Sequence, residues 1–493
     1  MTLMDRRAFL ARGAAGVLTV SALERLARRD AAARPFGPSS YGPPERTPDQ
    51  RGRFILAVPA GFSYVTFGDI GHPMSDGNVT PLALDGMNAF PGPDGTVRLV
   101  RNHEDRNPAG AGSVGGDPAA KYDAAGGGGT STLDYDPVSR TLVRDFISLN
   151  GTTVNCAGGY GLGHRSWLTG EESIRGPEHL TPAQQFPKRH GYLFEVPVDR
   201  DMGELTAAEP LRAMGRFAHE AAATDQETGV VYETEDAAGG RGSGFYRFIP
   251  DDVNDLAAGG RLQMLAIKDR PNYDAREGQR PGKPLPIDWV DIDDPDPPYA
   301  NDDDPRRTFE QGWRRGGTKF NRLEGCWYDA GSIYFVSTSG GDVKNGDMNP
   351  DGYREGFGQV WEYRPRASAG GQLVLAYESP GAESLDSPDN LTVTPRGGLM
   401  LCEDDASGAH VDTHPTAPGI RQVNRVIGVN RDGEAFEFAV NTYSGSELAG
   451  VCFSPDGQTV FVNVFGDSSG TPAQHFEKGM TCAITGRWGD GPL

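Results

Sequence analysis

Residues 149–173 read LNGTTVNCAGGYGLGHRSWLTGEES, two β-rich runs separated by a glycine-rich turn. This pattern is typical of a β-hairpin. In a hairpin the beginning of the first strand lies beside the end of the second, so Cys156 is expected near Glu171 and Glu172. A thiolate beside carboxylates is a metal-binding combination, since sulfur suits iron or zinc and oxygen suits calcium. A buried free cysteine beside a solvated acidic turn is the alternative for this segment taken alone.

The same unit recurs along the chain as a turn with Gly or Asp, a β-rich run and a polar end. The six copies end at Glu104, Glu172, Asp236, Ser339, Asp404 and Asn463. Each copy is flanked by further short β-rich runs, so that four strands repeat six times. The pattern predicts an all-β fold, a six-bladed β-propeller of four-stranded antiparallel blades with minor helical insertions. A pair of β-sandwiches is the alternative, and the clearest helix is expected at residues 305–315.

These repeats divide the chain into three parts. We expect a signal peptide at residues 1–33, a linker at residues 34–52 and the propeller at residues 53–493, with an insert at about 251–319. The last repeat lacks a fourth strand. Residues 53–58 or 64–67 are the two candidates to supply it and close the ring.

The N-terminus and the composition indicate an exported protein. Asp5-Arg6-Arg7-Ala8-Phe9-Leu10 is a twin-arginine motif followed by an apolar run, although an amphipathic helix is the alternative. We therefore expect passage through the twin-arginine export machinery to the periplasm or the extracellular space. The net charge of −21 argues against nucleic acid and anionic membranes as partners, and no apolar run is long enough to span a bilayer. We expect a monomer with no stable membrane association.

The 5 cysteines form no CxxC pair, so neither a disulfide framework nor a thiolate zinc site is indicated. An exported protein with an unpaired thiol needs something to protect that thiol, and a bound metal would do so.

Polar residues recur at two positions of the repeat, the start of the first strand and the end of the second, which share one mouth of a propeller. These positions hold Asp85, His103, Glu104, Cys156, Glu171, Glu172, Glu220, Glu235, Asp236, Glu324, Thr338, Ser339, Asp389, Asn390, Glu403, Asp404, Glu447 and Asn463. So many carboxylates would repel one another in a medium of low dielectric constant. Bound cations are the expected remedy, and a solvated acidic ring is the alternative.

Two arginines are expected at the same mouth. Arg322 lies two residues before Glu324 and therefore points to the same side of its strand, and Arg425 opens a third strand. Arginine beside multivalent cations is what a phosphate ester site requires, because the cations polarise phosphoryl oxygens and a guanidinium binds the remaining oxygens. Neutralisation of a neighbouring glutamate is the alternative for either arginine.

Several motifs together, in this order along the chain, resemble the PhoX-type alkaline phosphatases: the twin-arginine start, NCAGG, WLTGEE, HEAA, RLEGCWYD, GQVWEYRP, SPDNL and LCEDD. The resemblance implies an exported six-bladed propeller that hydrolyses phosphate monoesters at a cluster of two Fe3+ ions and Ca2+. It implies that Cys156 bridges the irons and that Glu220 and Glu324 are further metal ligands. The other implied metal ligands, not assigned to either ion, are Glu171, Glu172, Glu235, Asp236, Asp389, Asn390, Glu403 and Asp404. The implied catalytic residues are Arg322, Arg425 and Asn155.

The chain departs from the family pattern at two places. Gly170 stands where a cysteine is common in WLTCEE-like motifs, and residues 466–478 form an acidic, Ser/Gly-rich stretch where a short turn is usual. A calcium-dependent lactonase-like propeller and a calcium-stabilised binding propeller without catalysis remain the alternatives to a phosphatase. Neither alternative needs iron or a thiolate ligand.

Overall fold

The computed structural model describes residues 41–179, 185–205, 207–237, 242–299, 304–366, 370–405, 411–466 and 479–493. The predicted signal peptide and the acidic stretch beyond residue 466 lie outside these ranges. Almost all regular structure in the described ranges is antiparallel β-sheet, and the one α-helix among them is α3 (Thr308–Arg314). This helix begins three residues later than the start predicted at residue 305. No helix in these ranges is long and apolar enough to cross a membrane.

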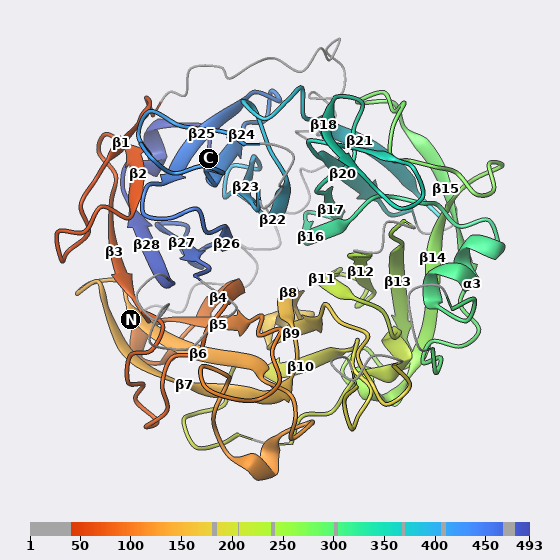
Figure 1. Ribbon diagram of the computed structural model, residues 1–493, viewed down its shortest axis with the longest axis horizontal. Coiled ribbons are helices and arrows are strands. Elements are labelled where there is room, and N and C mark those ends of the chain that lie inside the picture. Colours follow the sequence, from red (N-terminus) through yellow and green to blue (C-terminus); the bar gives the residue numbers. More distant parts are fainter. Residues whose placement is uncertain are drawn as a thin grey trace, which may run out of the picture.

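The strands radiate from a central axis, as in a propeller (Figure 1). The first sheet contains β4 (Leu84–Pro91), β5 (Val97–His103), β6 (Gly128–Asp136) and β7 (Thr141–Thr152). The second contains β8 (Asn155–Tyr160), β9 (Ser166–Glu171) and β10 (Leu193–Pro197). The next sheet has nine strands, in the order β11 (His219–Thr224), β12 (Val231–Glu235), β13 (Phe245–Pro250), β14 (Gly260–Ile267), β15 (Leu285–Asp291), β21 (Gln372–Glu378), β20 (Gln359–Arg364), β17 (Ser332–Ser337) and β16 (Leu323–Asp329).

The remaining strands complete the circle. A six-stranded sheet has the order β1 (Pro44–Arg46), β2 (Leu56–Pro59), β25 (Ala435–Asn441), β24 (Arg425–Val429), β23 (Leu399–Glu403) and β22 (Pro388–Val393). A four-stranded sheet contains β26 (Leu448–Phe453), β27 (Thr459–Val464), β28 (Met480–Thr485) and β3 (Ser63–Phe67). A small sheet of β18 (Lys344–Met348) and β19 (Arg354–Gly356) lies in the β17–β20 connection.

The sheets are less regular than the predicted six blades of four strands. Among the described residues only two sheets have four strands, and the larger ones have six and nine. The nine-stranded sheet arises because β15, within the predicted insert, pairs with β14 on one side and with β21 on the other. The six-stranded sheet arises because β1 and β2 from the N-terminal region extend β25. β1 also lies within the range predicted as a linker.

The ring is closed by a strand from the N-terminal region. Of the two candidate segments, residues 64–67 supply the closing strand, since β3 pairs with β28 over five residues. Residues 56–59, which overlap the other candidate, pair with β25 instead. Apolar side chains of neighbouring sheets pack between them, and one such cluster joins Ile55, Phe62 and Tyr64 to Val462 and Cys482. The N-terminal and C-terminal strands are therefore parts of one core.

Six strands line the axis: β4, β8, β11, β16, β22 and β26. Each contacts the next, and β26 contacts β4 (Figure 1). This close packing is possible because small residues recur along these strands. A Cβ atom at Gly86 would lie 2.5 Å from Ala157 Cα, and one at Gly325 would lie 2.7 Å from the carbonyl oxygen of Asp389. The backbones therefore approach one another directly, and side chains that point to the axis must meet.

Candidate metal centre

Every axial strand is irregular at the same point. The pairing of each axial strand with the second strand of its sheet shifts register near its start, at a β-bulge. Five of the six bulges begin with a residue that can bind a metal: Asp85, Cys156, Glu220, Glu324 and Asp389. A bulge re-aims a side chain that regular pleating would place elsewhere. The bulges therefore place these five donors in equivalent positions around the axis.

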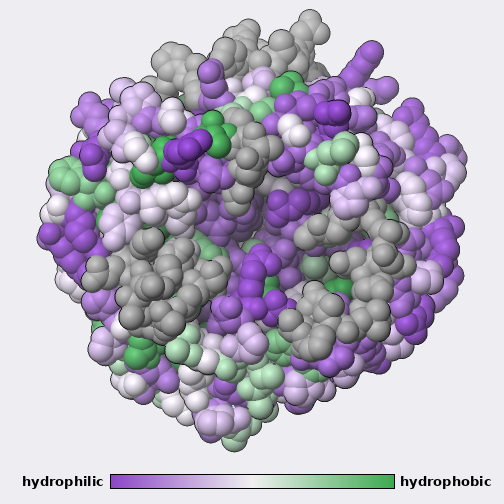
Figure 2. All heavy atoms as spheres, in the orientation of Figure 1, coloured by the Kyte–Doolittle hydropathy of each residue, from purple (hydrophilic) through white to green (hydrophobic). Residues whose placement is uncertain are grey.

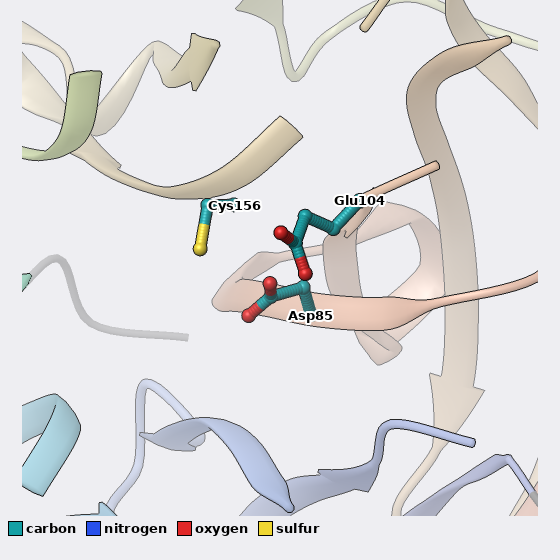
Figure 3. Close-up of side chains that lie close together, drawn as sticks. All are labelled: Asp85, Glu104 and Cys156. Carbon is teal, nitrogen blue, oxygen red and sulfur yellow. The ribbon is translucent and has the colours of Figure 1, made fainter. Parts of the chain in front are cut away.

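The donor atoms lie close together. Four overlapping groups have atoms within 4.8 Å of one another: Asp85, Glu104 and Cys156; Cys156, Glu172 and Glu220; Glu220, Glu324 and Asp389; and Asp389, Asp404 and Glu447. We call these nine residues the donor ring. Figure 3 shows the first group, in which Cys156 from β8, Asp85 from β4 and Glu104 from just beyond β5 point into a shared space. In Figure 2 hydrophilic side chains gather around a hollow near the centre of the molecule.

Burial makes this arrangement unfavourable without cations. Asp85 and Glu220 are 1% and 0% exposed, and neither Asp85 Oδ1 nor either Glu220 oxygen has a hydrogen-bond partner among the described residues. Burial and then neighbouring carboxylates raise the pKa of both groups well above their ordinary values. Burial, followed by the charges of Asp85 and Glu220, likewise raises the pKa of the Cys156 thiol. A bound cation would supply the missing partner and favour the charged forms.

The paired acids at the ends of the second strands divide into two roles. The residue just beyond the strand, Glu104, Glu172 or Asp404, belongs to the donor ring. The residue before it points away, as alternation along a strand requires. Glu171 accepts hydrogen bonds at 2.6 Å from His190 Nδ1 and at 2.8 Å from the backbone N–H of Gly191.

Glu235 and Glu403 follow the same rule as Glu171. Glu235 accepts a hydrogen bond from the Tyr246 hydroxyl at 2.6 Å, and its other oxygen pairs with Arg307 at 3.2 Å. Glu403 forms a two-pronged ion pair with Arg425, with both N···O distances 2.7 Å. Burial raises the pKa of Glu403 to about 7, although Arg425 partly offsets this effect. These carboxylates tie neighbouring strands together outside the donor ring.

The three predicted catalytic residues lie in different surroundings. Arg322 lies at the donor ring, where its guanidinium pairs at 3.0 Å with both Asp236 and Glu324 and its side chain is 34% exposed. Arg425 is buried, and besides Glu403 its guanidinium binds the carbonyl oxygen of Ala382. Asn155 lies within the sheet, where its side chain accepts from Thr152 and donates to Thr169. Of these three residues, only Arg322 therefore has a partly exposed side chain at the donor ring.

Two further predicted ligands lie beside the ring rather than in it. Asp236 faces Arg322, and burial raises its pKa to about 6 although the arginine charge opposes the rise. Asn390 donates a hydrogen bond at 2.8 Å to Asp389 Oδ1 and accepts one from the backbone of Gly450. These two side chains orient the groups that they touch.

The structure adds residues that the predicted ligand set lacked. Asp85, Glu104 and Glu447 belong to the donor ring. All three stand at the repeat positions that the sequence analysis assigned to the mouth of the propeller. Those positions alone could have identified them as metal ligands. The repeat pattern did not point to Arg106, because this residue lies in the loop between β5 and β6 and not at a repeat position. Its guanidinium pairs with Glu104 and, at 2.8 Å, with Glu172, and its side chain is 51% exposed.

Comparison with known proteins identifies the family of this chain. The family model described as alkaline phosphatase PhoX matches residues 39–467. The chain belongs to the PhoX alkaline phosphatase family. The predictions of this family and of an alkaline phosphatase enzyme are therefore confirmed. No curated protein matches the sequence of this PhoX family member.

Among solved structures, Pseudomonas fluorescens PhoX in complex with vanadate, a transition state analogue, is similar with a TM-score of 0.65 and 19% identity over 93% of this chain and 99% of that one. This likeness supports the propeller fold. A protein of unknown function from Dyadobacter fermentans has a TM-score of 0.44 and 10% identity over 87% of this chain and 100% of that one. The gluconolactonase XC5397 from Xanthomonas campestris has a TM-score of 0.37 and 12% identity over 92% and 98%.

Proposed function

We propose that this chain is an exported, metal-dependent phosphatase that hydrolyses phosphate monoesters at a cluster of iron and calcium held by the donor ring. The observation behind the proposal is the chain of four overlapping donor groups, in which Cys156 is shared by two groups and Glu220 by two. Sulfur among the donors favours iron, and the sites made only of carboxylates suit calcium. The bound ions would polarise a phosphoryl oxygen and activate water.

The residues of the chain itself would position the ester. Arg322 is partly exposed and is held by Asp236 on one side and Glu324 on the other, which fixes the direction of its guanidinium. Burial lowers the pKa of Arg322, but the charges of these two carboxylates outweigh burial and raise it, so the side chain stays charged at alkaline pH. A fixed guanidinium can donate two hydrogen bonds to a phosphoryl group. Arg322 would therefore bind and orient the phosphate.

Two finer features belong to this proposal. We count the propeller as six-bladed, because six bulged axial strands form a closed ring and the nine-stranded sheet contains two of them, β11 and β16. We also propose export by the twin-arginine route, on the motif at Arg6 and Arg7. Small phosphate monoesters are the proposed substrates, and the protein would act as a monomer.

Metal analysis of the purified protein, with a chromogenic phosphate monoester assay at alkaline pH, tests the proposal. We expect iron together with calcium, and loss of activity after chelation. Cys156→Ala should lose iron and activity, whereas Cys452→Ala, a buried cysteine outside the donor ring, should keep both. Arg322→Ala should raise KM by about 10- to 100-fold, the value of a charge-assisted contact, with unchanged metal content. Activity in Cys156→Ala, or calcium without iron, would contradict the iron assignment.

A further inference from the structure

A second cavity lies at the opposite end of the axial strands. The donor ring occupies the beginnings of these strands, and their far ends surround a space of about 680 Å³. Tyr160 ends β8, Thr224 ends β11 and Phe453 ends β26 at this cavity. Small-molecule sites in proteins typically have volumes of about 300 to 1,000 Å³. The opposite mouth of the propeller is therefore large enough for a ligand of its own.

A constriction separates this cavity from the donor ring. The space between them measures about 20 Å³ and is lined by small residues of the axial strands, among them Gly86, Ala157 and Gly325. Trp327 lines both the constriction and the far cavity. A phosphate ester cannot pass through so narrow a space. The far cavity is thus a site separate from the metal centre.

Aromatic side chains give the cavity a fixed apolar wall. The ring of Tyr160 stacks on His164 with 4.2 Å between centroids and meets Trp327 edge-on at 5.6 Å. The Tyr160 hydroxyl donates to the carbonyl oxygen of Ala89 at 2.8 Å, which holds the ring in place. The indole N–H of Trp327 donates no hydrogen bond to any residue that the structure describes. It is thus available to a bound molecule.

Two buried hydroxyl groups at the cavity lack partners. Thr224 and Thr392 line it and are 3% and 1% exposed, and the Oγ1 of each has no hydrogen-bond partner in the described parts of the chain. A buried hydroxyl without a partner costs free energy, and a ligand or water that reached it from the cavity would supply the missing bond. Each hydroxyl can both donate and accept.

The charges at the cavity are nearly balanced. Asp329 and Arg431 both line it, and Asp456 uses its carboxylate for the Ser454 hydroxyl and the backbone of Gln458. Because two aspartates and one arginine line the cavity, an anionic ligand is not favoured. A cationic ligand is not favoured either, because the positive charge of Arg431 acts on Asp329. The site instead offers hydroxyl donors and acceptors, one carboxylate, one guanidinium and an aromatic wall. A ligand with many hydroxyl groups and an apolar face matches that set.

We propose that this cavity binds a neutral sugar of monosaccharide or disaccharide size, with its apolar face on the aromatic wall and its hydroxyl groups on Thr224, Thr392 and Asp329. This site is independent of the phosphatase chemistry. It would let the protein bind a carbohydrate on the face opposite its metal centre.

Titration of the full chain with glucose, galactose, maltose and cellobiose tests the proposal, followed by ligand-observed NMR and tryptophan fluorescence. We expect saturable binding of at least one sugar. Thr392→Val keeps the side-chain shape and removes only an unpartnered hydroxyl, so it should fold normally and weaken binding about tenfold. Asp329→Asn should weaken it similarly. Thr47→Val, in the N-terminal region and not among the residues that line the cavity, is the control.

Two results would overturn the proposal. One is the absence of saturation for all four sugars up to about 100 mM, which would mean that the cavity holds water. The other is binding of equal affinity in the wild type, Thr392→Val and Asp329→Asn, which would place the sugar elsewhere. If Thr392→Val lost its cooperative unfolding transition, Thr224→Val would decide by the same affinity measurement. Phosphatase activity should be unchanged in Thr224→Val, Thr392→Val and Asp329→Asn.

Discussion

Cys156 shows how a residue's surroundings determine its chemistry. All 5 cysteines are free and buried in the structure. Burial alone raises the pKa of Cys452, whereas four carboxylates add to the effect of burial at Cys156. A thiol in that setting stays protonated unless a cation replaces the proton. The same residue type is thus a core side chain in one axial strand and a candidate ligand in another.

His190 gives a pH-dependent prediction at the residue scale. The imidazole is fully buried, with Nδ1 2.6 Å from Glu171 and Nε2 3.5 Å from Asp123. Burial lowers its pKa, but the two carboxylates outweigh burial and raise it from 6.5 to about 9. Because the folded-state pKa is the higher one, the stabilisation is complete below pH 6.5 and is lost as pH rises through 9. The loss should be about 3 kcal/mol.

Urea unfolding of the wild type and of His190→Gln, each from pH 6 to 10, measures this effect. The free energy of unfolding should fall with pH more steeply in the wild type than in His190→Gln, since glutamine does not titrate. Parallel pH curves for the two proteins would show that His190 is neutral in the folded state.

Sequence reasoning found much of the donor ring residue by residue. Cys156, Glu172, Glu220, Glu324, Asp389 and Asp404 were all selected, and all lie in it. The first members of the paired acids lie outside the ring, because a side chain's direction depends on where its strand ends; they are Glu171, Glu235 and Glu403. That boundary is a hydrogen-bonding property of the whole sheet. For Arg425 the sequence left two alternatives, phosphate binding and neutralisation of a neighbouring glutamate, and its ion pair with Glu403 supports the second.

At the scale of strands, the bulges were the feature that the sequence could not reveal. A pattern of alternating residues predicts strands but assumes regular pairing, whereas each axial strand has two residues opposite one of its partner. The second residue of the bulge is small in four of the six strands, Gly86, Ala157, Ala221 and Gly325. The recurring motif is therefore a donor followed by a small residue.

Gly170 allows a prediction at this scale. It lies opposite the bulge of β8, and a Cβ there would lie 2.8 Å from the carbonyl oxygen of His219 and 3.0 Å from its Cβ. A cysteine at this position would therefore push β9 away from β11. We expect Gly170→Cys to lower the free energy of unfolding by about 1–3 kcal/mol, measured by urea denaturation under reducing conditions.

Gly489→Cys is the matched control for this substitution. A Cβ at Gly489 would have no atom within 4 Å, so the added thiol should leave the stability nearly unchanged. Equal stability of Gly170→Cys and the wild type would mean that β9 and β11 can separate without cost. Glycine at position 170 would then have no packing reason.

At the scale of the whole molecule, the ring of strands was predictable from the sequence, but the strand pairings that connect one sheet to the next were not. The all-β, propeller-like ring was predictable from the sequence, because each repeated unit has its own turn and β-rich run. The pairings between sheets could not be predicted. That of β15 with β21, for example, consists of only two residue pairs between segments far apart in the chain. Such contacts depend on where the ring brings the outer strands. The sequence left two candidate segments for the strand that closes the ring, and only the pairing with β28 selects between them.

Closure of the ring gives the last prediction. β3 pairs with β28, and residues 55–67 contribute Ile55, Leu56, Val58, Phe62 and Tyr64 to the cluster that also contains Val462 and Ile484. A chain that begins at residue 69 would leave the β28 edge unpaired and expose this apolar surface, so it should aggregate or lose cooperative unfolding. A chain that begins at residue 41 keeps every strand described here and is the control. Size-exclusion chromatography and urea unfolding distinguish the two, and a monomeric, cooperatively folded 69–493 chain would show that the other sheets hold the ring closed without β3.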